Sequence, residues 1–112
     1  MPINYLETSG LGLRWMRTYY QKNPQLNRAA ALAALKNAEL LLADFPYSGE
    51  CYEDYENVRE YHIHATAFSL LYTFQHGTIW IIDVRDQRGN RSAEAIRDFN
   101  KEIRSKHGLK SL

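Results

Sequence analysis

The residues best suited to chemistry in this 112-residue chain lie in its second half. His62 and His64 are two positions apart in a run of β-forming residues, so both side chains project from one face of a strand. Two histidines can begin a metal site, but a zinc site takes three or four ligands, and no further ligand follows at a suitable spacing. We predict neither a metal ion nor another cofactor. His64 is the candidate for general acid–base catalysis.

The single cysteine, Cys51, is not a candidate nucleophile. Its neighbours include Glu50, Glu53 and Asp54, and negative charge disfavours the thiolate that a catalytic cysteine needs. A lone cysteine also excludes a disulfide within the chain and suits a reducing compartment. No basic segment followed by an apolar run opens the sequence, so we expect a cytoplasmic protein.

Three arginines follow the most apolar run of the chain, at Arg85, Arg88 and Arg91. Such a cluster suits an acidic protein surface or a phosphate, with a strength that depends on salt. The alternative is an ordinary solvated strand end in which the arginines pair with Asp83 and Asp86. The residues alone leave both interpretations open, so all three arginines are candidates for binding a target.

The net charge of +1 conceals a separation of charge along the chain. Residues 45–62 hold one basic and five acidic side chains, whereas residues 83–112 hold eight basic and five acidic ones. This distribution argues against a general nucleic-acid-binding protein, and an anionic partner is expected to approach the C-terminal third. No apolar run reaches the roughly 18 residues that a membrane span needs, so no membrane contact is expected.

The first half of the chain predicts a short strand over residues 3–7 and then two helices. In residues 11–21 the polar side chains recur at the i, i+3, i+4 and i+7 spacing of a helical stripe. Asn23 and Pro24 predict the start of the second helix, which runs to about residue 44. The short connection predicts an αα-hairpin.

The first of these helices has an apolar face wider than packing on one neighbour requires. Aromatic residues at helical spacing are usually core, but surplus apolar surface also suits a partner that lays an amphipathic helix into a groove. In the second helix a leucine interrupts the polar side and extends this surface. The candidate partner-binding residues are Leu13, Trp15, Met16, Tyr19, Tyr20 and Leu32.

Residues 58–64, 68–74 and 78–85 are three β-rich runs joined by short turns. They predict a three-stranded antiparallel meander. Arg59, at the start of the first run, is interpreted as structural, either paired with Glu56 or capping backbone carbonyls. The third run is apolar on both of its alternating faces, so it requires a cover on each side.

The C-terminal segment provides the second cover in this prediction. Residues 92–107 predict a helix in which Ile96, Phe99 and Ile103 form a narrow apolar stripe and Gly108 ends the helix. No repeat or linker divides the chain. We therefore predict one α+β domain over residues 1–112, made of an N-terminal strand, an αα-hairpin, a three-stranded antiparallel meander and a C-terminal helix.

A longer motif runs from the end of the second helix into the meander. Phe45-Pro46-Tyr47-Ser48-Gly49 precedes Val58-Arg59-Glu60, and an apolar last strand ends in basic residues. This order resembles the RelE/ParE toxins of type II toxin–antitoxin systems over residues 3–88. The resemblance implies a toxin held inactive by a cognate antitoxin. RelE-type members cleave mRNA in the ribosome with basic residues on the sheet, whereas ParE-type members poison DNA gyrase.

The chain departs from the ribonuclease members of that family at the sheet. Where those members place lysines it has Glu60 and His62, and where they place an arginine it has Ser69. Losing cations that stabilise a phosphorane-like dianion lowers transition-state binding. The resemblance therefore predicts a gyrase poison of the ParE branch, which meets nucleic acid only indirectly, through that target. The alternatives are a ribosome-dependent endoribonuclease using His64, Arg85 and Arg88, or a binding module without toxicity.

Overall fold

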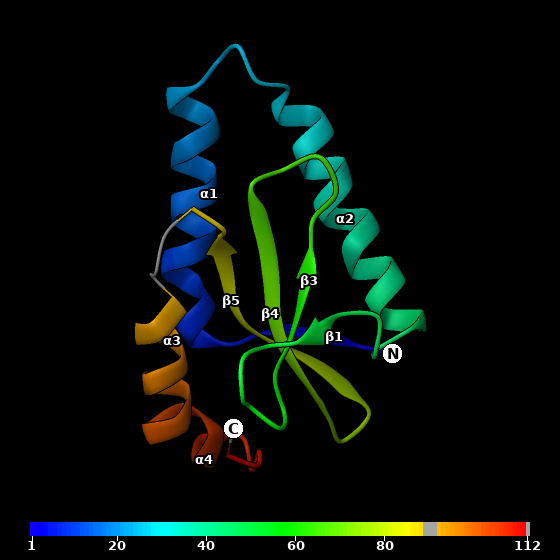
Figure 1. Ribbon diagram of the computed structural model, residues 1–112, viewed down its shortest axis with the longest axis vertical. Coiled ribbons are helices and arrows are strands. Elements are labelled where there is room, and N and C mark those ends of the chain that lie inside the picture. Colours follow the sequence, from blue (N-terminus) through cyan, green and yellow to red (C-terminus); the bar gives the residue numbers. More distant parts are fainter. Residues whose placement is uncertain (89–91, 112) are drawn as a thin grey trace.

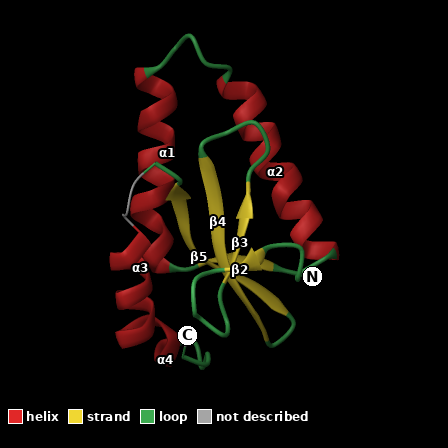
Figure 2. Ribbon diagram, viewed as in Figure 1, coloured by secondary structure: helices red, strands yellow, loops and turns green. Residues whose placement is uncertain are grey.

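The computed structural model describes residues 1–88 and 92–111, and its α+β class agrees with the prediction (Figure 1). The chain forms one five-stranded sheet with helical segments packed against it (Figure 2). The strands are β1 (Ile3–Tyr5), β2 (Glu50–Cys51), β3 (Arg59–His62), β4 (Phe68–Gln75) and β5 (Thr78–Asp86). The helices are α1 (Gly10–Lys22), α2 (Arg28–Asp44), α3 (Ser92–Asp98) and α4 (Arg104–Lys106), with a 3-10 turn η1 (Glu7–Ser9) and a π-helical turn η2 (Phe99–Ile103).

The sheet has the strand order β1-β5-β4-β3-β2. The strand β4 pairs antiparallel with both β3 and β5, while β1 pairs parallel with β5. One residue-pair shift interrupts the β4–β5 register between Leu71 and Tyr72. The two edge strands are the shortest, at three and two residues, which limits open edge available for pairing with other chains.

One face of the sheet is covered by α1 and α2. Their inward side chains, among them Met16, Ala38 and Leu42, bury the apolar side chains of β4 and β5. The helix α1 approaches β5 so closely that a Cβ atom at Gly12 would lie 2.3 Å from the carbonyl oxygen of Val84. Glycine at this position is therefore what allows α1 to pack against the sheet edge.

The other face of the sheet is covered by the C-terminal segment. Ile96 and Phe99 are buried against Leu71 and Ile82, as the apolar stripe in that segment predicts. The segment is helical from α3 through η2 to α4, so it includes a π-helical turn that the sequence did not indicate. The strand β5 is therefore covered on both faces.

Polar contacts hold the end of this C-terminal cover. Glu7 accepts a hydrogen bond from Lys106 at 2.7 Å and contacts the His107 ring nitrogen at 3.0 Å. At the far end the backbone N–H of Lys110 donates to Gln75 at 2.8 Å. Lys106 and His107 together hold the pKa of Glu7 at about 2, with Lys106 the larger cause.

Two sequence predictions about element boundaries were wrong. The second helix does not begin at Asn23 and Pro24: it begins at Arg28, because the side chain of Asn27 caps it by accepting the N–H of Ala30 at 2.9 Å. Residues 23–27 form the connection, with a turn in which Leu26 donates to Asn23. The first strand ends at Tyr5 rather than at residue 7, because residues 7–9 form η1.

The loop after α2 is also more ordered than a plain loop, since it contains β2. The hydroxyl of Tyr72 donates to the carbonyl of Pro46 at 2.7 Å and accepts the N–H of Gly49 at 2.9 Å. Arg59 donates to the carbonyls of Gly49 at 2.7 Å and Tyr47 at 3.4 Å. The interpretation of Arg59 as a cap for backbone carbonyls is confirmed.

None of the helices in the described part of the chain has the length and apolar character that crossing a bilayer requires.

Candidate functional site

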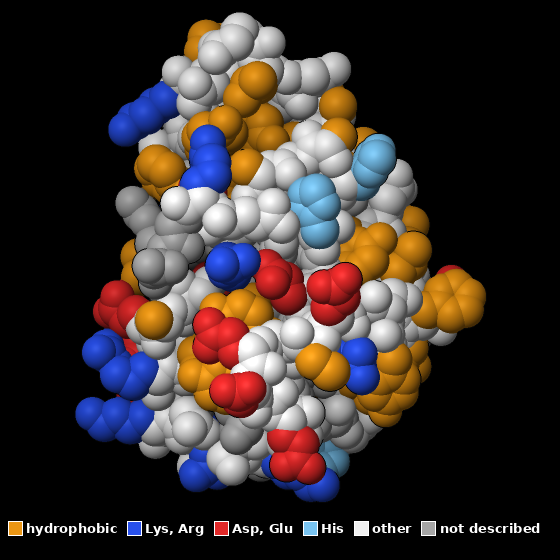
Figure 3. Space-filling view, viewed as in Figure 1, with side chains coloured by type: hydrophobic (Ala, Val, Ile, Leu, Met, Phe, Trp, Pro, Cys, Tyr) orange, Lys and Arg blue, Asp and Glu red, His pale blue; other side chains and the backbone are white. Residues whose placement is uncertain are grey.

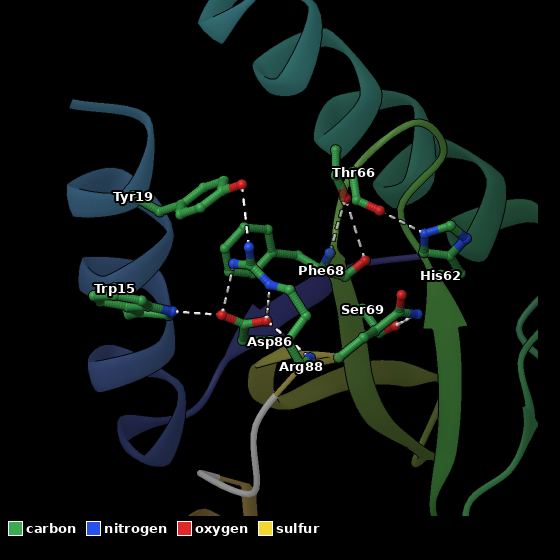
Figure 4. Close-up of polar contacts among 9 residues, drawn as sticks. Trp15, Tyr19, His62, Thr66, Phe68, Ser69, Asp86 and Arg88 are labelled. Carbon is green, nitrogen blue, oxygen red and sulfur yellow. Dashed lines mark hydrogen bonds and ion pairs between the residues drawn. The ribbon is translucent and has the colours of Figure 1, made fainter. Parts of the chain in front are cut away.

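A compact polar cluster joins the end of β5 to α1 (Figure 4). The carboxylate of Asp86 accepts the indole N–H of Trp15 at 2.8 Å and two hydrogen bonds from the guanidinium of Arg88, each at 3.0 Å. That guanidinium also lies over the ring of Tyr19, 4.4 Å from its centroid, and donates to its hydroxyl at 3.2 Å. The cluster pins α1 to the strand end.

The electrostatics of this cluster follow from the bidentate pair. Arg88 holds the pKa of Asp86 at about 2, and Asp86 in turn raises the pKa of Arg88. The side chain of Arg88 is still 50% exposed, so one side of the guanidinium faces solvent. Arg91, the third predicted target-binding residue, lies outside the described residues.

Arg85 lies in a different environment, on the sheet face away from α1. Its guanidinium donates to Glu60 at 2.7 Å, and it lies over the ring of Tyr52, 5.7 Å from the centroid. Only 22% of its side chain is exposed. The pairing follows from strand register, because Glu60 lies on β3 and Arg85 on β5, the two strands that flank β4. Arg85 and Arg88 therefore each carry an internal carboxylate partner.

A shallow polar hollow of about 360 Å³ lies on the sheet beside this ion pair. His62, Ser69 and Gln87 line it, and Gln87 donates to the Ser69 hydroxyl at 2.7 Å. The ring of His62 contacts the carbonyl of Thr66 at 2.7 Å. His64 lines the same hollow, but Arg85 and Arg88 do not. The three residues of the ribonuclease alternative are thus not brought into one site.

Acidic side chains gather near the middle of the molecular face seen in Figure 3, with histidines beside them. Lysine and arginine side chains lie mainly over α3 and α4, at the lower left of the view, and over α1, at the upper left. A surface of this kind offers little positive potential for a phosphate at the sheet itself.

An apolar groove lies between α1 and α2 and contains most of the predicted partner-binding residues. Its floor and walls are formed by Leu13, Met16, Tyr20, Ala31, Leu32 and Leu35, with Arg17 and Arg28 at its sides. Met16 is buried, so it supports the groove from below. The side chain of Leu32 is 56% exposed. We call this surface the interhelical groove.

The other two predicted partner-binding residues lie elsewhere. Tyr19 lines a second, shallower depression between α2 and the turn that joins β3 to β4, where alanines form the floor. Trp15 contributes to the polar cluster at Asp86, as described above. The predicted set is therefore one groove of four residues, Leu13, Met16, Tyr20 and Leu32, with two residues beside it.

Asp83, expected from the sequence only as a possible partner for an arginine, is a buried carboxylate with a different partner. It accepts a hydrogen bond from the Ser92 hydroxyl at 2.8 Å, and only 4% of the residue is exposed. Burial raises its pKa to about 6, although the hydrogen bond from Ser92 opposes the shift. Because strand position alone does not reveal which residue packs over a side chain, no sequence signal identifies it. Among the described residues, no group of three His, Cys, Asp or Glu side chains is placed to hold a metal ion.

The sheet, the two covering helices and the interhelical groove define a small α+β protein with an apolar groove between its two long helices. The family comparison is specific: the family described as ParE toxin of type II toxin-antitoxin system, parDE, matches residues 13–91. The chain therefore belongs to the ParE toxin family. Neither the curated proteins nor the solved structures contain a significant match to it. The family match leaves out β1 and the C-terminal cover from Ser92 onward.

Proposed function

We propose that this chain is a toxin that arrests growth by poisoning DNA gyrase and that a cognate antitoxin neutralises it by direct binding. Membership of the ParE toxin family supports the toxin role and implies an antitoxin partner. The choice of gyrase over the ribosome rests on the chemistry of the sheet.

The observation that carries this choice is the ion pair between Glu60 and Arg85 at 2.7 Å. Cleavage of RNA needs cations that stabilise the negative charge developing on the phosphate. Here the arginine on the sheet face is neutralised by a carboxylate, and Glu60 also adds negative charge where a phosphate would bind. This arrangement favours binding to a protein target over catalysis on RNA.

The antitoxin contact is assigned to the interhelical groove. Amphipathic helices bind in apolar grooves through a few anchor side chains, and Leu13, Tyr20 and Leu32 supply a matching surface. The arginines Arg17 and Arg28 flank the apolar floor, so the groove suits a helix with apolar anchors and polar flanks.

The target contact is assigned to the basic end of β5, formed by Arg85, Arg88 and Arg91. Of the two described arginines, Arg88 has the more exposed side chain, at 50% against 22%. The cluster with Asp86 and Tyr19 holds its guanidinium in one orientation, which reduces the entropy lost on binding a target.

The test compares both activities on the same purified protein. Gyrase supercoiling and mRNA cleavage on translating ribosomes are measured side by side, with and without the antitoxin. We expect supercoiling to stop and mRNA to stay intact, and we expect the antitoxin to restore supercoiling. Codon-dependent cuts in mRNA with normal supercoiling would instead support the endoribonuclease alternative. No effect in either assay would support a binding module without toxicity.

A further inference from the structure

The outward face of α2 exposes a leucine between two charged side chains. Leu40 projects from its last two turns, with 62% of the residue exposed. Ala29, Ala33, Lys36 and Asp44 are also exposed, and they lie within about 40° of Leu40 around the helix axis. These five residues form one stripe, which we call the α2 stripe. It faces away from the core, whose α2 contacts are Ala38 and Leu42.

The charges in the α2 stripe are arranged symmetrically about Leu40. Lys36 precedes Leu40 by four residues, and Asp44 follows it by four. Within the described residues, neither side chain has an ion-pair or hydrogen-bond partner. Followed from its C-terminus, α2 has the same spacing of charges about Leu40, with Asp44 in the place of Lys36. When two such helices cross antiparallel at Leu40, each Lys36 therefore lies opposite Asp44 of the second copy.

A hollow of about 330 Å³ lies immediately beside Leu40, between α2 and the edge strand β1. Met1, Ile3 and Ala43 line it, so its surface is largely apolar. The hydroxyl of Tyr5 donates to Glu39 at 2.7 Å and ties β1 to α2 across the hollow. The carboxylate of Glu39 is thus partly satisfied within the chain. A projecting leucine with an apolar hollow beside it is the arrangement that a two-fold interface requires.

We infer that the α2 stripe is a self-complementary docking surface for a second copy of this chain. The two α2 helices cross antiparallel, and Leu40 of each copy enters the hollow beside Leu40 of the other. Lys36 and Asp44 form two equivalent ion pairs that fix the direction and register of the crossing. Phe45 and Tyr47, which follow the helix and are strongly exposed, then lie toward the alanine-rich start of the second α2.

The symmetric placement of Lys36 and Asp44 allows a charge-swap test of this dimer. The mass of the isolated, full-length chain in solution is measured as a function of concentration for the wild type and for Lys36→Glu and Asp44→Lys. We expect a wild-type dimer and at least about a tenfold weaker association for each single variant, because each homodimer then has two like-charge contacts. An equimolar mixture of the two variants regains the dimer, since opposite charges face each other again at both positions.

Two further variants keep the result specific. Leu40→Asn removes the apolar anchor and gives a monomer, whereas Lys22→Glu reverses an exposed charge at the end of α1, outside the stripe, and leaves the dimer intact. All the substituted residues are exposed, so thermal melting is expected to stay close to that of the wild type for each. A monomeric wild type at every soluble concentration would overturn the inference. So would single charge variants that dimerise like the wild type, or a mixture that stays monomeric.

Discussion

The two faces of the sheet are built differently although they share β4 and β5. On the first face, α1 and α2 pack over the sheet within the stretch that matches the ParE toxin family, and the polar cluster at Asp86 fixes α1 at the strand end. On the second face, a segment beyond that match covers Leu71 and Ile82 and is tied down by exposed polar contacts such as Glu7–Lys106. The helices on the first face enclose the interhelical groove, whereas the segment on the second face closes the core.

Two aspartates three residues apart on β5 differ in the partners that these surroundings supply. Asp86 meets Arg88 and an indole N–H on the side of α1, and its pKa falls to about 2. Asp83 is buried with a hydroxyl from Ser92 as partner, and its pKa rises to about 6. Asp86 therefore has a cation beside it, whereas Asp83, which lies between the backbone of Gly12 on α1 and Ser92 of the C-terminal cover, has only uncharged hydrogen-bond partners. The following predictions test this contrast, from the largest expected effect to the smallest.

Removing the C-terminal cover is expected to cost the most. A chain that ends at Asn90 loses Ile96 and Phe99, which are buried, and exposes the apolar face of β5. Their burial contributes on the order of 5 kcal/mol before chain entropy is subtracted. Thermal melting checks this, and the truncated chain should melt far below the full chain. An unchanged melting temperature would mean that the segment serves another chain.

The close approach of α1 to β5 gives the next largest effect. The substitution Gly12→Ala places a Cβ atom 2.3 Å from the Val84 carbonyl oxygen, so α1 must move away from the strand. We expect a loss of about 3 kcal/mol in the free energy of unfolding, measured with urea. Gly10→Ala is the matched control on the same helix, because its Cβ has only Arg14 at 3.5 Å. The control should be neutral or slightly stabilising, and equal losses in both variants would contradict the account.

The two aspartates predict effects of opposite sign at pH 7. The pKa of Asp83 in the folded state, about 6, lies above the usual 3.8, so its ionisation destabilises the fold increasingly from about pH 4 to pH 6. Asp83→Asn removes this cost while its amide oxygen can still accept the Ser92 hydrogen bond. We expect it to raise the free energy of unfolding at pH 7 by about 2 kcal/mol and to have little effect near pH 3.

Asp86→Asn is the matched comparison for Asp83→Asn. The folded-state pKa of Asp86, about 2, lies below 3.8, so its ionisation stabilises the fold above about pH 4, and this contribution is lost as the pH falls toward 2. We expect this variant to be destabilised by about 1 kcal/mol at pH 7, because solvent screens the half-exposed Arg88. Urea unfolding of both variants between pH 3 and 8 checks the prediction. The same sign for the two at pH 7 would contradict it.

The smallest effect is expected at the exposed contacts that Glu7 makes with the end of the C-terminal cover. Glu7→Gln removes the ion pair with Lys106 and the contact with His107, all on the surface. The global stability should change little, because exposed ion pairs contribute little. Amide hydrogen exchange in α4 should nevertheless become faster, since the end of the segment is freed. Unchanged hydrogen exchange in α4 would show that Phe99 and the rest of the apolar stripe hold the segment without the Glu7 contacts.

The parts of this structure that the sequence predicted are those encoded by local periodicity. The strand runs, the two long helices and the burial of Ile96 and Phe99 follow from spacing alone. The start of α2 was misplaced because Asn23-Pro24 is a turn signal as well as a helix-start signal, and Asn27 supplies a second possible cap. Capping residues this close together cannot be ranked without the tertiary contacts.

The candidate sites depended more on contacts between distant residues. The Glu60–Arg85 pair joins residues 25 positions apart and requires the register of three strands. Trp15 was grouped with the partner-binding aromatics of α1, yet its indole N–H donates to Asp86, 71 positions away. Helical spacing predicted the interhelical groove, because four of its residues recur on one side of α1 and α2. Helical spacing does not indicate which arginines pair with a carboxylate of the same chain, as Arg85 and Arg88 do.

The groove assignment predicts a variant that escapes neutralisation. Leu32→Glu places a charge on the exposed wall of the interhelical groove, which is expected to weaken antitoxin binding at least about tenfold while leaving toxicity intact. Leu11→Glu is the matched control, since Leu11 is similarly exposed but lies outside the groove. Calorimetric affinity for the antitoxin separates the two. Equal affinities would remove the antitoxin contact from this groove.

The proposed target contact at the arginines and the proposed antitoxin contact in the interhelical groove are two separate surfaces. The most direct test of this separation is the growth of cells that produce the Arg88→Ala, Arg91→Ala double variant without antitoxin. Tyr19→Phe serves as the control for the polar cluster, because it removes one hydrogen bond to Arg88 and leaves both arginines in place. We predict that the double variant fails to arrest growth but keeps tight antitoxin binding, which an unfolded chain would lose. Growth arrest by the double variant at the same expression level as the wild type would contradict the assignment of the target contact to this end of β5.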